Sequence, residues 1–488
     1  MDQSMMKAAL AKVPLALKTA AAHTLGLTET SSKWTLKQEV FVTVLRSFLQ
    51  GDSPKLSSLQ RGTLKDPGIK GKKWVSKYTI PKPSEGENGV REKLFGAIEA
   101  MKTGNEEYLK ADSIPVEVEW TGYQKDATDK TQELDISEAE KYANMMKDIT
   151  NDVTVLYLHG GAYYLLDPAF YRDSMQKIAQ MTGGRTYSVR YRLAPQNPFP
   201  SALMDALTAY LSLLSPPPGA PHAAVPANNI VFAGDSAGGN LSAVLLQLIL
   251  QLHRMAGPGK IPEIEFGGKM VPVPVPGGTV LISPWCDMTA CMDSTKRFLK
   301  YDYLVHTCTQ FASLPSCSIW PAKPPRLDIY CEGSALCHPL VSPLAAQDWT
   351  GAPPTMVITG EEVLADEAAS IASLMAKQGV VVEWEQYEAM PHVFGMMFID
   401  ENVGKMFFDT WARFCKEVVA GKVGTSKGTY VTAKLLERKA LDPAKLLDEL
   451  GVKHEDVLGL MTRKRDAAMK DFEVYQAKIS ESGTPSKL

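Results

Sequence analysis

A serine set between small residues, directly after an apolar run, is the feature that most restricts what this chain can fold into. Ile230 to Ala233 is a short β-rich run, Gly234 to Gly238 reads GDSAG around Ser236, and a long apolar stretch typical of a buried helix begins at Ala237. Strand, tight turn and helix in this order fit a G-x-S-x-G elbow, which leaves the serine hydroxyl raised above a sheet. By composition alone the pattern occurs in roughly one chain in five of this length, so the assignment needs partner residues.

A pair of glycines behind an earlier apolar run is the first such partner. Thr154 to Leu158 leads into His159-Gly160-Gly161. Residues without side chains can direct backbone N–H groups into a cavity, where they stabilise a developing oxyanion. We therefore predict an oxyanion hole formed by the N–H groups of Gly160, Gly161 and Ala237.

The candidate acid and base come later in the chain, again behind apolar runs. Residues 354–359 (PTMVIT) lead into a cluster of acids that includes Glu362, and residues 380–387 lead into Pro391-His392-Val393. The order serine, acid, histidine predicts a nucleophile, an orienting carboxylate and a general base. We expect Ser236 to attack an acyl carbonyl, His392 to carry its proton, and the carboxylate to hold the imidazole.

Together these motifs resemble the hormone-sensitive-lipase-like branch of the α/β-hydrolase superfamily. The resemblance spans about residues 154–414 and implies an α/β fold with a mostly parallel central sheet, helices on both faces and a helical cap. It rests on His159-Gly160-Gly161, Tyr191 to Pro195, Phe199-Pro200, Asp205, Gly234 to Asn240 and Ser283-Pro284-Trp285. Filamentous-fungal members are further resembled at Lys65 to Pro81, Glu119 to Gly122 and His338 to Pro343.

The chain departs from the family pattern at two positions. A third glycine is usual where this chain has Ala162, and the family's acid, normally Asp, opens the motif acid-x-Leu-x-Asp-Glu at Glu362. We predict Glu362 rather than Asp366 as the triad acid, because Glu362 lies two residues beyond Gly360. Asp366 and Glu367 fall in the first turn of the next helix, where carboxylates complement the helix dipole.

Composition narrows the remaining classes of function. The chain has 488 residues, of which 45% are hydrophobic and 22% charged, and a net charge of -3. This balance gives no reason to expect a nucleic-acid partner, and no stretch approaches the ~18 apolar residues of a membrane span. Six of the seven cysteines lie between Cys286 and Cys337 without C-x-x-C spacing. We expect free thiols, with disulfides or a metal site as alternatives, and no metal or organic cofactor.

The chain divides into three predicted parts. We expect cap helices in residues 1–70, a catalytic domain over 71–420 with a cap insertion at about 286–345, and a charged helical extension over 421–488. A surface loop is expected at Ala256 to Gly278 and a helix at Arg91 to Lys110. A helix lying on a membrane surface is the alternative for the first stretch, because Lys7, Lys12 and Lys18 accompany an apolar face.

The predicted function is hydrolysis of small-molecule carboxylic esters through an acyl-enzyme intermediate. An acyl-CoA thioesterase or a transacylase would use the same triad and is the alternative. The resembled family also implies a third possibility, a non-catalytic ligand-binding receptor that lacks the histidine. Retention of His392 favours an enzyme.

The last three residues predict a location. Ser486-Lys487-Leu488 matches S-K-L, the address read by the peroxisomal import receptor, and follows a polar stretch over Ser480 to Pro485. We therefore expect a peroxisomal protein with the import receptor as a partner. Location and fungal resemblance together suggest a role in secondary-metabolite or toxin biosynthesis.

Overall fold

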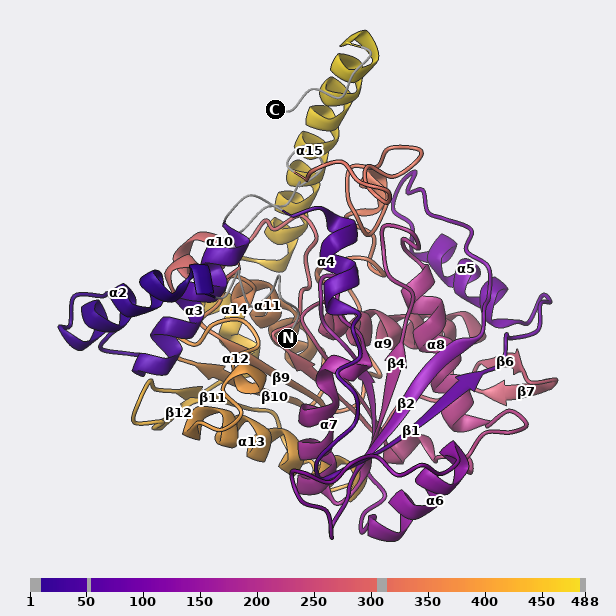
Figure 1. The fold of residues 1–488 in the computed structure, drawn as a ribbon. Coiled ribbons are helices and arrows are strands. Elements are labelled where there is room, and N and C mark those ends of the chain that lie inside the picture. The colour runs from indigo at the N-terminus through magenta and orange to yellow at the C-terminus, as the bar shows by residue number, and fades with distance from the viewer. Residues whose placement is uncertain (1–9, 51–53, 305–313, 483–488) are drawn as a thin grey trace.

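A ten-stranded sheet runs through the whole molecule, and the helices lie against its two faces (Figure 1). The computed structural model describes residues 10–50, 54–304 and 314–482. Neighbouring strands from β4 to β11 are parallel, whereas β1, β2 and β12 run antiparallel to their neighbours. In spatial order the strands are β1 (Lys73–Ile80), β2 (Val116–Tyr123), β4 (Arg185–Arg190), β3 (Thr154–Leu158), β5 (Ile230–Asp235), β8 (Gly278–Ile282), β9 (Thr355–Gly360), β10 (Val382–Tyr387), β11 (Lys427–Val431) and β12 (Arg438–Leu441).

The helices follow the strands in the alternation expected of a parallel sheet. The longer ones are α2 (Val13–Thr24), α3 (Leu36–Leu49), α4 (Leu56–Thr63), α5 (Val90–Met101), α6 (Glu138–Asp148), α7 (Pro168–Thr182), α8 (Ser201–Leu214), α9 (Ala237–Ala256), α11 (Ala365–Lys377), α13 (Asn402–Val419) and α15 (His454–Ser482). Single-turn helices are α10 (Ser294–Arg297), α12 (Phe394–Met397) and α14 (Leu446–Glu449). The predicted α/β class is confirmed, as are the strand over 154–158 and the helix over 36–49.

Both faces of the central strands are buried, which explains their almost continuous apolar sequences. Along β3, Val155 and Tyr157 pack into a core shared with α7 and α13, whereas Leu156 and Leu158 pack into a core shared with α8 and α9. Successive side chains of a strand point to opposite faces, so a strand that is covered on both faces must be apolar throughout. Because both faces of the sheet are packed against these cores, the ends of its strands hold the residues that follow them in fixed positions.

The C-terminal extension differs from its prediction. Residues 427–431 form β11, which lies parallel to β10 with Val431 opposite Tyr387, and β12 completes the edge. The extension is therefore helical only from Pro443 onward, and its first part belongs to the central sheet. Its last helix, α15, extends away from the body of the molecule (Figure 1).

Three further predictions are corrected. The expected surface loop at 256–278 contains a hairpin of β6 (Glu263–Phe266) and β7 (Lys269–Pro272). Its turn residues Gly267 and Gly268 have φ of 59° and 75°, as a two-residue turn matched to the twist of the strands requires. The helix expected to reach Lys110 ends at Met101. The insertion at 286–345 contains, among its described residues, only single helical turns.

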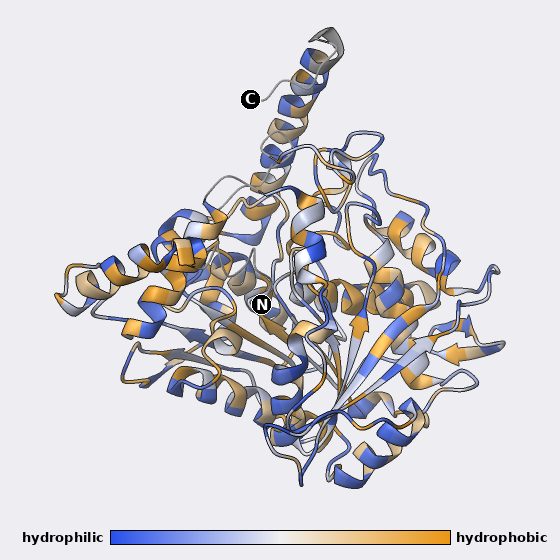
Figure 2. Cartoon of the chain, viewed as in Figure 1, coloured by the Kyte–Doolittle hydropathy of each residue, from blue (hydrophilic) through white to orange (hydrophobic). Residues whose placement is uncertain are grey.

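The N-terminal helices α2 and α3 lie at the side of the molecule and carry hydrophobic residues (Figure 2). Several of these apolar side chains are exposed. Leu17 is 66% exposed, and Leu17, Phe41 and Phe48 line a groove of about 840 Å³ between the two helices. The alternative of a membrane-surface helix remains a prediction, and Lys7 lies outside the described residues. None of the helices that the structure describes is both long and apolar enough to span a bilayer.

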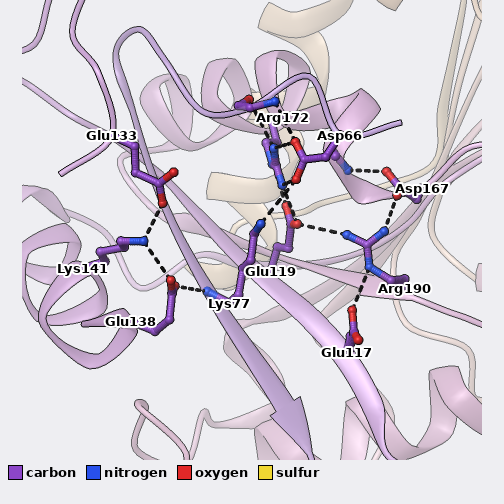
Figure 3. A network of polar contacts seen from close by, with 12 residues as sticks. Asp66, Lys77, Glu117, Glu119, Glu133, Glu138, Lys141, Asp167, Arg172 and Arg190 are labelled. Atoms are coloured by element: carbon purple, nitrogen blue, oxygen red, sulfur yellow. Dashed lines mark hydrogen bonds and ion pairs between the residues drawn. The ribbon is translucent and has the colours of Figure 1, made fainter. Parts of the chain in front are cut away.

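A network of ion pairs, centred on the buried side chains of Arg172 and Glu119, fastens the segment before β1 to the sheet (Figure 3). The guanidinium of Arg172 on α7 binds Glu119 of β2 at 2.7 Å and Asp66 at 2.6 Å. Arg190 of β4 binds Glu119 at 3.2 Å and also pairs with Asp167. Removing one partner of a buried pair typically costs about 3–5 kcal/mol, because the other charge stays buried. Asp167 ends the loop after β3, so the network also holds the far end of that loop.

Candidate active site

Ser236 occupies the sharp turn between β5 and α9. Its φ of 55° and ψ of -120° are a conformation that L-residues rarely adopt. The flanking glycines are required by close backbone approach, since a Cβ on Gly238 would lie 2.0 Å from the carbonyl oxygen of Leu158. Ser236 donates its backbone N–H to Ile282 at 2.9 Å and accepts the N–H of Trp285 at 3.0 Å. The strained turn is thus held by the last residue of β8 and by Trp285, which follows that strand.

Glu362 and His392 meet at the ends of two adjacent parallel strands. Glu362 follows β9, His392 follows β10, and Nδ1 of His392 lies 3.3 Å from Oε1 of Glu362. Both side chains are buried, with exposures of 0% and 3%. The carboxyl ends of parallel strands share one edge of the sheet, which is why residues 30 positions apart come into contact.

Ser283 joins this pair to the serine elbow. Its hydroxyl donates to Oε2 of Glu362 at 2.8 Å and accepts the N–H of Val393 at 3.1 Å. The preceding residue, Ile282, holds the N–H of Ser236. Two consecutive residues at the end of β8 therefore hold Ser236 on one side and the loops of Glu362 and His392 on the other.

Asp366, the rival for the role of acid, bonds to the insertion instead. One carboxylate oxygen accepts the N–H of Ser294 at 2.9 Å, and the other pairs with Arg297 at 2.5 Å. Asp366 lies in the first turn of α11, as the sequence predicted. Of the two carboxylates, Glu362 is the one placed against His392.

The predicted oxyanion hole needs one correction. The N–H of Gly160 donates to Oδ1 of Asp235 at 2.9 Å and is therefore already occupied. Gly161 and Ala162 follow with φ of 104° and 52°. Because a positive φ favours glycine, the backbone at Ala162 explains why the family usually has a third glycine there. The N–H groups of Gly161, Ala162 and Ala237 find no acceptor among the described residues. These three groups, rather than that of Gly160, are available to bind an oxyanion.

Asp235 is the centre of a buried cluster beneath the loop after β3. Besides the N–H of Gly160, its carboxylate accepts the hydroxyls of Tyr157 at 2.5 Å and Tyr171 at 3.0 Å. Burial raises the pKa of Asp235, and its hydrogen bonds to Tyr157 and Tyr171 oppose that effect. The residue before the nucleophile therefore ties the oxyanion loop to the elbow.

His159 and Asp205 have structural roles. Burial lowers the pKa of His159 to about 3, so its ring is neutral, and the ring stacks on Tyr191 at a centroid distance of 4.2 Å. Asp205 of α8 forms a double contact with the guanidinium of Arg192, at 2.7 and 2.9 Å, and orients the loop after β4.

The charges around His392 determine its protonation. Burial alone lowers the pKa of His392, but the charge and hydrogen bond of Glu362 and the charges of Asp302 and Asp235 outweigh burial. The net result is a pKa raised above the usual value of histidine. A raised pKa makes the imidazole a better proton acceptor, provided that the pH is high enough to leave it neutral.

Comparison with known proteins identifies the family. The profile of the α/β-hydrolase fold matches residues 155–396. An acetyl-hydrolase of Streptomyces hygroscopicus is 32% identical over 243 residues, which cover 49% of this chain and 67% of that protein. The chain belongs to the α/β-hydrolase family.

An esterase of Acinetobacter venetianus is 27% identical over 54% of this chain and 72% of its own length. Lipase 2 of Moraxella sp. is 26% identical over 54% of this chain, and only 59% of that lipase is covered.

Solved α/β-hydrolase structures share the fold. EstE5 soaked with p-nitrophenyl butyrate superposes with a TM-score of 0.54 at 21% identity, over 79% of this chain and 100% of EstE5. An esterase from the bacterial hormone-sensitive lipase family gives a TM-score of 0.50 at 22% identity, over 79% of this chain and 99% of the esterase. These structures show the fold alone. The matches to the family profile and to the acetyl-hydrolase and the esterase show that the chain is an enzyme of the carboxylic ester hydrolase family.

Sequence reasoning on this hydrolase missed Asp302, a buried aspartate of the insertion. It accepts backbone N–H bonds from Val363 and His392, next to and within the candidate triad. No motif surrounds it in the sequence, so no local signal could have found it. Ser283 was found only as part of a family motif, without its role between acid and histidine.

Two remaining predictions concern metal sites and targeting. Six of the cysteines lie in the described part of the chain, and these are unpaired. Over the same residues no group of three or more candidate ligands could hold a metal ion. Ser486, Lys487 and Leu488 lie outside the described residues.

Proposed function

We propose that this α/β-hydrolase cleaves carboxylic esters with Ser236 as nucleophile, His392 as general base and Glu362 as the orienting acid. The observation that carries the proposal is the buried contact between His392 and Glu362, joined through Ser283 to the loop beside the serine elbow. With Nδ1 turned to Glu362, the imidazole has Nε2 left to serve the serine hydroxyl. This is the division of roles that a serine nucleophile requires.

In the first half-reaction the Ser236 oxygen bonds to the acyl carbon while its proton passes to His392. The tetrahedral oxyanion is bound by the N–H groups of Gly161, Ala162 and Ala237, and one such donor typically contributes about 3 kcal/mol. The carbon–oxygen bond to the alcohol then breaks, and His392 donates its proton to that leaving group. In the second half-reaction water attacks the acyl-enzyme by the same route, which releases the acid and restores the serine.

Acyl-CoA thioesters and acyl acceptors other than water remain the alternatives, because both share this first half-reaction. We expect short-chain esters to be hydrolysed, and Ser236 to be labelled covalently by an organophosphate. The experiment is a chain-length series of p-nitrophenyl and CoA esters with the purified protein, followed by mass-spectrometric mapping of the label. Product analysis with added alcohols separates hydrolysis from transfer. A protein that neither turns over esters nor becomes labelled would contradict the proposal and agree with a receptor.

We further propose that the protein acts in the peroxisome, on small-molecule esters that include intermediates of secondary metabolism. The support for this location is the tripeptide Ser486-Lys487-Leu488, which the import receptor would bind through a free carboxyl end. A fluorescent tag fused before Met1 should give a punctate signal that coincides with a peroxisomal marker. Deleting the tripeptide should disperse it, and a diffuse signal from the intact tagged chain would contradict the proposed location.

A further inference from the structure

A third carboxylate lies beside the candidate triad and comes from the insertion. Asp302 is fully buried and follows a single helical turn at 299–301. One of its carboxylate oxygens accepts the N–H of Val363 at 2.9 Å, the residue after Glu362. The other oxygen accepts the N–H of His392 at 3.3 Å and that of Leu304 at 3.2 Å. A single side chain thus bonds to the loop that carries the acid and to the loop that carries the base.

The N-terminal helix α3 holds Asp302 in this position. Nε of Arg46 donates to the carbonyl of Asp302 at 2.8 Å, and Nη2 donates to the carbonyls of Leu299 and Lys300 at 3.2 and 2.9 Å. The planar guanidinium therefore binds the carbonyl groups of one helical turn at the same time. The single ammonium group of a lysine could not reproduce this geometry. A contact chain runs from α3 through Arg46 and Asp302 to the backbone of both triad loops.

The same helix segment reaches the histidine loop a second time. Nε1 of Trp34, just before α3, donates to the carbonyl of Ala389 at 2.5 Å. Ala389 lies three residues before His392 in the loop after β10. Two independent contacts thus connect the N-terminal segment to the elements that position the base.

Several charged or titratable groups surround His392. Glu362 approaches from the loop after β9, Asp235 from the serine elbow, and Asp302 from the insertion, while the ring of Tyr303 lies 6.0 Å from the imidazole. Arg46 faces Asp302 from α3. Asp302 is the one carboxylate among them that belongs to the cap.

We propose that Asp302 is a positioning residue of the triad, which locks the acid loop to the histidine loop and stabilises the protonated imidazole with its negative charge. The inference rests on the proposed function, since it assigns a role in the same catalytic step. The way in which the insertion and α3 pack against the two triad loops then determines the orientation of His392. The cap thereby acts on the chemistry through Asp302, in addition to covering the site.

The test is the pH profile of kcat/KM for a short-chain ester in Asp302→Asn. The amide keeps the shape of the side chain but removes the charge and turns an NH₂ group toward a backbone N–H donor. We expect kcat to fall about 10- to 100-fold through misalignment of the base. Loss of a negative charge lowers the pKa of His392, and the base must be neutral to act. The acid limb of the profile should therefore move to lower pH, by about one unit.

Asp287→Asn is the matched control. Asp287 is equally buried in the same insertion, but its carboxylate bonds to residues 289 and 291 of its own turn. This variant should retain the wild-type acid limb. If Asp302→Asn does not fold, Arg46→Lys provides the second variant: it keeps the carboxylate and should lower kcat without moving the limb.

If the wild type is active and Asp302→Asn keeps both the wild-type kcat and the wild-type acid limb of the kcat/KM profile, this inference is overturned. The proposed function would then remain intact. An equal shift of the limb in Asp287→Asn would also overturn it, because the shift would then be unspecific. A wild type without esterase turnover would instead contradict the proposed function.

Discussion

Ser236→Ala is expected to lower kcat for ester hydrolysis by about 10⁶-fold, as removal of the nucleophile does in other serine hydrolases. Alanine fits the turn, because the strain at φ 55° lies in the backbone and the hydroxyl makes no contact that the elbow needs. The loss should appear in kcat with little change in the temperature of unfolding. Covalent labelling by an organophosphate should disappear in the same variant.

Ser242→Ala is a suitable control for this variant. Ser242 lies on α9, six residues after the nucleophile, and its buried hydroxyl only bonds back to the carbonyl of Gly238 at 2.9 Å. It should keep near wild-type turnover and labelling. Persistent labelling or turnover in purified Ser236→Ala would show that another residue is the nucleophile.

Glu362→Gln is expected to lower kcat by about 10⁴-fold with the fold intact, since loss of the triad acid has that effect elsewhere. The amide no longer stabilises the protonated imidazole, and its NH₂ group can select the wrong tautomer of His392. The buried glutamate also accepts the hydroxyl of Ser283 at 2.8 Å, so its loss weakens the link to the histidine loop. Steady-state kinetics and thermal unfolding, measured on the same preparation, separate lost chemistry from lost stability.

Asp366→Asn is the discriminating comparison for Glu362. Asp366 pairs with Arg297, whose side chain is 41% exposed, so solvent screens this contact and an asparagine can still accept the N–H of Ser294. This variant should lose a little stability and retain most of its turnover. The reverse result, with Asp366→Asn inactive and Glu362→Gln active, would transfer the role of acid to Asp366.

Local sequence patterns were sufficient for much of the fold. The apolar run at 154–158 and the periodicity at 36–49 gave the bounds of β3 and α3 as the structure has them. The hairpin of β6 and β7 was missed although Gly267-Gly268 is a turn signal, because the prolines at 272, 274 and 276 are typical of a loop and disfavour a strand. Strand β11 was missed because its few apolar residues form a strand only where β10 offers a free edge to pair with.

The candidate site shows the same division. Ser236, Glu362 and His392 each follow a buried strand, so their approach at one sheet edge could be predicted from the order of strands. The hydrogen bond from the Gly160 N–H to Asp235 could not be predicted, because it joins a loop to a strand end 75 residues away in the chain. The sequence suggested that this loop forms an oxyanion hole. Only the contacts in the structure show that the N–H of Gly160 is occupied, whereas those of Gly161 and Ala162 are available.

The sequence by itself determined the class of fold, the order of the candidate nucleophile, acid and base, and the strained elbow, because each depends on backbone preferences within a few residues. Tertiary structure decided which N–H groups remain free, which carboxylate faces His392, and that Asp302 of the insertion bonds to both triad loops. These are contacts between segments that are distant in the chain. Their geometry is set by the packing of the insertion and the helices on the sheet, which no local pattern encodes.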